Sequence, residues 1–147
     1  MTSSAPLPLI DNWRLIQTEA NAVLIGRVSG RPRTPDGAIV VTSPVSQLDE
    51  GAGTATTRSG TVYRLGVPWS ADEALPDGYR RALIQKMAAA GGGTLTESRL
   101  AAISAVAARC CRAGAKVDEA ILARLRPVSM SWNDVHLRAP WATDKQS

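Results

Sequence analysis

Few side chains in this sequence have the chemistry of a nucleophile or a metal ligand, and their spacing suits neither role. The chain has two adjacent cysteines, Cys110 and Cys111, and one histidine, His136. Structural zinc needs separated pairs of Cys or His ligands, which adjacent cysteines do not supply. A Ser-His-Asp or Cys-His arrangement would have to use His136, and no Gly-x-Ser-x-Gly motif is present. We therefore expect no enzyme, no cofactor and no metal site; catalysis through His136 is the third functional alternative.

A glycine run before an expected helix is the one candidate for a phosphate loop. Gly91-Gly92-Gly93-Thr94 stands where a helix N-terminus would attract anions. It has no Gly-Lys-Ser/Thr and no preceding strand, so neither the nucleotide-binding loop nor the dinucleotide fingerprint is met. We interpret the run as a linker between helices.

Arginine is the residue type best suited to binding. The 147-residue chain has 14 arginines against three lysines and a net charge of +4. Arginine binds phosphate and carboxylate groups bidentately, although a GC-rich genome would also enrich it. Gly30-Arg31-Pro32-Arg33 is similar to half of an AT-hook, which lies in the DNA minor groove. An ordinary hairpin loop is the other interpretation of this segment.

A second basic group lies in residues 99–126, where two expected helices meet near Gly114. The pair resembles a DNA-reading helix-turn-helix. However, Asp118 and Glu119 would open the recognition helix where phosphates come close, which favours a plain helical hairpin. The basic side chains of this stretch are Arg99, Arg109, Arg112, Lys116, Arg124 and Arg126.

Short strands with tight turns are expected in the first half of the chain. Apolar runs rich in Val and Ile, bounded by Gly, Pro and Asp, are typical of strands. Tyr63 and Leu65 alternate with polar residues and should share a buried face. We predict strands over 13–17, 22–29, 38–43, 54–57 and 61–65, with the turn of a hairpin at 30–37, a second hairpin around Ser59-Gly60, and a loop or one helical turn over 44–53.

Helices are expected in the second half. Tyr79, Leu83 and Met87 recur at helical spacing in a stretch from Asp77 to about Ala90. Thr94 and Glu97 fit a capping box for a second helix to about Arg112, and a third is predicted from Asp118 to Arg126. The second helix should bury Leu100, Ile103, Val106, Ala107 and Cys110, with one cysteine in the core and the other half-exposed.

These elements predict an α+β fold with a small N-terminal antiparallel sheet or partial barrel, followed by two to three packed helices. We expect a lead-in over 1–10 and one domain over 11–147: a β-rich part (11–70), a helical part (71–127) and a tail (128–147) that docks through Trp132 and Trp141. We expect no signal peptide, and the sequence has no apolar run of about 20 residues and no disulfide framework. We therefore expect a cytoplasmic protein with no membrane contact.

One stretch resembles a known family. It runs through Leu24-x-Gly26-x-Val28-x-Gly30-x-Pro32-Arg33, Asp36-Gly37 and Thr42-Ser43-Pro44-Val45 to Thr57-x-Ser59 and Tyr63-Arg64-Leu65-Gly66. This is similar to an uncharacterised family of short bacterial and prophage proteins of unknown function. The resemblance covers about residues 13 to 70 and implies a specific β-hairpin module, with no activity attached.

Two functions of different classes are left open. The first is a small non-enzymatic protein-interaction module, such as a regulator or inhibitor carried by a mobile element, which binds an unknown protein. It predicts an exposed apolar patch near Trp69, Trp132 or Trp141. The second is a basic nucleic-acid-binding protein, which predicts that Arg31, Arg33, Arg109 and Arg112 converge on one face.

Overall fold

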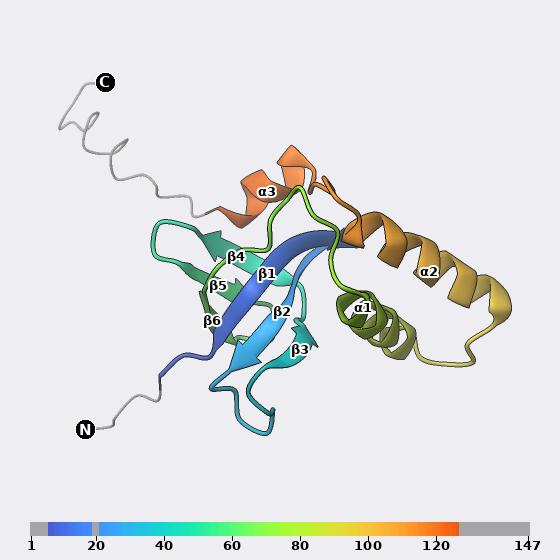
Figure 1. Cartoon of the computed structure of the whole chain (residues 1–147), viewed down its shortest axis with the longest axis horizontal. Helices are drawn as coiled ribbons and strands as arrows, with labels where there is room; N and C mark the ends of the chain where they lie inside the picture. Colours follow the sequence, from blue (N-terminus) through green and yellow to red (C-terminus); the bar gives the residue numbers. More distant parts are fainter. Residues whose placement is uncertain (1–5, 19–20, 127–147) are drawn as a thin grey trace.

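Six strands followed by three helices make up the fold of the computed structural model, which describes residues 6–18 and 21–126 (Figure 1). The strands form one open mixed sheet in the order β3-β2-β1-β6-β5-β4. The strands are β1 (Leu9–Thr18), β2 (Asn21–Ser29), β3 (Ala38–Val41), β4 (Val45–Asp49), β5 (Thr54–Thr57) and β6 (Val62–Leu65), and the helices are α1 (Asp77–Ala90), α2 (Glu97–Cys111) and α3 (Glu119–Leu125). The predicted α+β class is confirmed.

A bulge in β1 decides which of its side chains face the helices. Between Asp11 and Arg14, β1 takes three residue steps where its antiparallel partner β2 takes two. One extra residue reverses the alternation of side chains beyond it. Ile10, before the bulge, therefore packs on one face of the sheet, and Ile16, after it, packs on the other.

The strand β4 corrects a prediction. Residues 44–53 were expected to be a loop or a helical turn, but Val45–Asp49 pairs antiparallel with β5. The register shifts between Val45 and Gln47, so the buried residues Val45 and Leu48 are three positions apart. This bulge hides the two-residue alternation by which a half-buried strand is recognised.

Two cores lie on opposite faces of the sheet, and β2 contributes to both. Its side chains alternate, with Ala22, Leu24 and Val28 on one face and Val23 and Ile25 on the other. The α3-side core contains Ile10, Ala22, Leu24, Val28, Val45, Leu48, Ala55, Tyr63, Ile121 and Leu125. The α1/α2-side core contains Ile16, Val23, Ile25, Val41, Leu75, Tyr79, Leu83, Ala107, Cys110 and Cys111.

The second helix begins later than predicted. The Thr96 hydroxyl accepts a 3.1 Å hydrogen bond from the Arg99 backbone N–H, so Thr96 is the N-cap and the expected capping box of Thr94 with Glu97 is wrong. Leu100, expected on the buried face, is 40% exposed.

The bounds of α1 agree with the prediction, and Gly91 follows its last residue. None of the helices in the described part of the chain has the length and apolar character to cross a membrane.

The helices α2 and α3 do not form the predicted helical hairpin. The helix α2 packs on α1 and β1, whereas α3 packs on β4. Figure 1 shows them separated by the segment of residues 112–118, which crosses near the end of β1. The helix-turn-helix interpretation is therefore wrong, because it requires α2 and α3 to pack as a pair.

Candidate functional site

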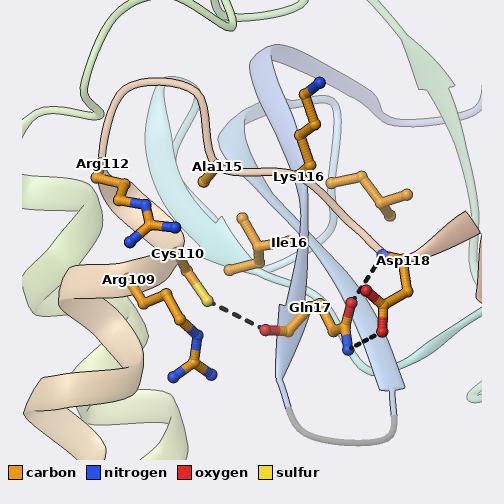
Figure 2. Close-up of a pocket in the computed structure, with 9 residues that line it drawn as sticks. Ile16, Gln17, Arg109, Cys110, Arg112, Ala115, Lys116 and Asp118 are labelled. Atoms are coloured by element: carbon orange, nitrogen blue, oxygen red, sulfur yellow. Dashed lines mark hydrogen bonds between the residues drawn. The ribbon is translucent and has the colours of Figure 1, made fainter.

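A cavity of about 220 Å³ lies where the end of β1 meets the end of α2 (Figure 2). Its walls come from the last residues of β1, the last turn of α2 and the segment that connects α2 to α3. Its lining residues are Leu15, Ile16, Gln17, Arg109, Cys110, Arg112, Ala115, Lys116 and Asp118. We call this cavity the basic pocket because it has three cationic side chains and, among the described residues, one carboxylate.

Arg14 fixes the geometry of this corner. Its guanidinium donates hydrogen bonds to the carbonyl oxygens of Arg112 at 3.0 Å and Cys110 at 3.5 Å, which lie at the C-terminal end of α2. Carbonyls at a helix end lack partners within the helix and carry partial negative charge. Since Arg14 satisfies these two, the cations of the pocket are not required for that purpose.

The cations that line the pocket are exposed, and Lys116 extends in a different direction from the two arginines. Figure 2 shows the side chains of Arg109 and Arg112 on one side of the pocket, with Lys116 extending away from both. Within the described part of the chain, the guanidinium groups of Arg109 and Arg112 form no hydrogen bond or ion pair. Two unengaged guanidinium groups beside one cavity suit a phosphate or a carboxylate, which arginine binds bidentately.

The single carboxylate of the pocket is already engaged. The Asp118 carboxylate accepts a 3.3 Å hydrogen bond from the Gln17 side-chain amide. The Asp118 backbone N–H donates to Gln17 Oε1 at 2.9 Å in return. This pair, visible in Figure 2, holds the start of α3 to the end of β1, and the acid lies on the side of the pocket opposite the two arginines.

The pocket cysteine is a buried, hydrogen-bonded thiol. Cys110 Sγ donates to the Gln17 carbonyl oxygen at 3.1 Å, and burial raises its pKa, with a smaller opposing effect from Arg109. A raised pKa lowers the fraction of thiolate, which is the nucleophilic form. Both cysteines are free and buried, so the expectation that one would be half-exposed is wrong.

The arginines predicted as one binding face lie in two places. Arg109 and Arg112 line the basic pocket. Arg31 and Arg33 follow β2, next to the end of the hairpin where Ser29 pairs with Leu9, whereas the pocket adjoins the other end at Gln17 (Figure 1). The structure therefore brings together one pair and leaves the other at the far end of the β1–β2 hairpin.

Of the three tryptophans expected near an exposed apolar patch, only Trp69 belongs to the described residues. Trp69 is half-buried: its indole N–H donates to the Ala74 carbonyl oxygen at 3.2 Å, and its ring lies 5.9 Å from that of Tyr79. Its neighbour Val67 is 64% exposed. Trp132, His136 and Trp141 lie outside the described residues, as does the predicted docking of the tail.

The structure also bears on metal ligands and on the glycine run. Among the described residues, no group of three His, Cys, Asp or Glu side chains could hold a metal ion. The glycine run is bridged by Arg99, whose guanidinium donates to the carbonyl oxygens of Gly92 at 3.0 Å and Ala88 at 2.8 Å. This contact joins the end of α1 to the start of α2, as a linker requires.

The sequence analysis named Lys116 in a basic stretch but did not select it as a site residue, and it missed Trp13. Lys116 belongs to the basic group of residues 99–126 and follows Arg112 by four positions, so its spacing was a usable signal. Trp13 lines a neighbouring cavity with residues more than 30 positions away, a relationship that no local pattern displays.

No family model, curated protein or solved structure matches this chain.

Proposed function

We propose that this protein binds nucleic acid by holding backbone phosphates at the basic pocket. The observation that carries this proposal is the pair Arg109 and Arg112, whose guanidinium groups are exposed and unengaged beside one cavity. Phosphate contacts from arginine and lysine supply most of the affinity of sequence-independent nucleic-acid binding. A net charge of +4 supports the same function by attracting polyanions.

The size of the pocket favours a phosphate that belongs to a polymer. Its volume of about 220 Å³ is below the range of roughly 300–1,000 Å³ in which proteins enclose whole small molecules. A backbone phosphate needs only a local, open cavity, because the rest of the strand continues along the surface. An acidic protein segment is the rival ligand, since a carboxylate also suits paired guanidinium groups.

The test is fluorescence anisotropy with the full chain and a fluorescein-labelled mixed-sequence oligonucleotide, single-stranded and duplex. We expect micromolar binding at about 50 mM salt that weakens steeply by about 200 mM. The variant Arg109→Gln/Arg112→Gln should lose about tenfold in affinity. Its salt dependence should become shallower by roughly 1.4 in log–log slope for single strands, because two phosphate contacts are removed.

The matched control is Arg31→Gln/Arg33→Gln, which removes the same charge at the far end of the β1–β2 hairpin. This variant should stay within about threefold of the wild-type affinity. Equal weakening by both double variants would show binding through overall charge and would overturn the pocket assignment. Absence of binding at low salt would overturn the function, and binding of a labelled poly-glutamate peptide instead would identify the protein-interaction alternative.

A further inference from the structure

A second cavity, of about 270 Å³, adjoins the basic pocket on the α3 side of β1. Leu15 and Lys116 line both cavities, so the two share a wall. We call the second one the Trp13 groove. Its lining residues are Trp13, Leu15, Leu48, Glu50, Lys116, Val117, Glu119, Leu122 and Arg126.

The apolar part of the groove is a fixed surface. The Trp13 indole N–H donates to the Gly66 carbonyl oxygen at 3.0 Å, which sets the orientation of the ring. Trp13, Leu15 and Val117 also pack against the α3-side core while remaining partly exposed. A held aromatic ring beside cationic side chains is the combination by which proteins bind single-stranded nucleic acid without sequence preference.

The charged rim is mixed, unlike that of the basic pocket. Glu50 and Glu119 are exposed carboxylates on the groove, and Lys116 and Arg126 are exposed cations. Carboxylates would repel a second phosphate, but they accept hydrogen bonds from the exocyclic amino groups of bases. The groove therefore complements a flat apolar group with amino substituents, joined to an anion that occupies the pocket next to it.

We infer that the Trp13 groove takes an unpaired nucleobase whose strand places a phosphate in the basic pocket, with Lys116 contacting the backbone between them. This assignment rests on the proposed function and adds the ligand class, which is single-stranded nucleic acid. In a duplex the bases are stacked and paired inside, so no base can enter the groove while its phosphate remains at the pocket.

The experiment compares three fluorescein-labelled 12-mers with the full-length protein: oligo-dC, the same backbone built from abasic sites, and the duplex of oligo-dC with oligo-dG. All carry backbone phosphates, and only the first offers unpaired bases. We expect oligo-dC to bind about tenfold more tightly than either of the others. The preference should persist at moderate salt, because stacking is screened less than phosphate contacts.

A variant pair ties the base preference to the groove. Leu122 is half-buried and lines the groove, whereas its neighbour Ala123 on α3 is exposed and does not line it. Leu122→Asn should abolish most of the preference for oligo-dC over the abasic strand. Ala123→Asn, which places the same residue on the same helix, should preserve it, and circular dichroism of both variants should show a folded protein.

The outcomes separate this inference from the function on which it rests. Equal affinity for oligo-dC and the abasic strand, with binding still lost in Arg109→Gln/Arg112→Gln, would overturn the groove assignment and leave phosphate binding intact. Loss of binding to every probe would overturn both. Equal effects of Leu122→Asn and Ala123→Asn on the preference would place the base elsewhere on the surface.

Discussion

The guanidinium of Arg14 donates a 3.0 Å hydrogen bond to the carbonyl oxygen of Arg112, which ties β1 to the segment after α2. It also donates to the carbonyl oxygens of Ser70 at 3.0 Å and Glu73 at 2.6 Å. Arg14 is only 7% exposed, and desolvation lowers its pKa. A charged group with neutral carbonyl partners therefore joins the strand, the segment before α1 and the end of α2 at one wall of the basic pocket.

Removal of this guanidinium should be among the most damaging single changes. In Arg14→Met several buried or partly buried carbonyls lose their donor, and each costs about 1–3 kcal/mol when left unsatisfied. We expect the free energy of unfolding to fall by about 3–5 kcal/mol, measured by urea denaturation. Arg14→Lys retains the charge but not the forked geometry and should give an intermediate loss. A change below about 1 kcal/mol for Arg14→Met would contradict this account.

The burial of Arg14 shows where sequence patterns stop being informative. Within a predicted strand over 13–17, an arginine is most simply expected to face solvent. The bulge between Asp11 and Arg14 instead turns it toward α2, and a bulge has no reliable local signature. The same cause hid β4, whereas the strands around Pro35-Asp36-Gly37 and Ser59-Gly60 were predictable because their turn residues are adjacent in sequence.

The candidate site was predictable to the same limited degree. Arg109 and Arg112 could be selected from the sequence because they belong to a basic stretch near a helix end. That one wall of their pocket is Gln17 of β1 depends on tertiary contacts, such as the Cys110–Gln17 hydrogen bond, which spans 93 positions. The separation of Arg31 from Arg109 was equally invisible, since it follows from the length and direction of the β1–β2 hairpin.

The packing of β1 against β2 should be intolerant of any side chain at Gly26. A Cβ atom there would lie 2.7 Å from the Asp11 carbonyl oxygen and 2.8 Å from Ile10 Cγ1. The first of these is a backbone atom, so the strands would have to move apart. We expect Gly26→Ala to destabilise the fold by about 2 kcal/mol or more, measured by thermal and urea unfolding.

Gly51→Ala is the matched control for that experiment. Its nearest contact would be Asp49 Oδ1 at 3.6 Å, an ordinary van der Waals distance. The free energy of unfolding should change by less than about 1 kcal/mol, because only the entropy of the unfolded chain is altered. Similar losses in both variants would mean that the close approach at Gly26 is not the cause.

The buried thiol of Cys111 predicts a loss of stability at alkaline pH. Burial, with a smaller effect from Cys110 and opposition from Arg14 and Arg80, raises its pKa from 9.0 to about 11. The unfolded chain therefore releases this proton first, so the contribution is complete below pH 9 and is lost as the pH rises toward 11. Urea denaturation should show a fall of about 2 kcal/mol across that window. Cys111→Ala should show a smaller fall, to which Cys110, Tyr63 and Tyr79 still contribute because burial also raises their pKa values. Parallel curves for the two proteins would exclude Cys111 as the group responsible.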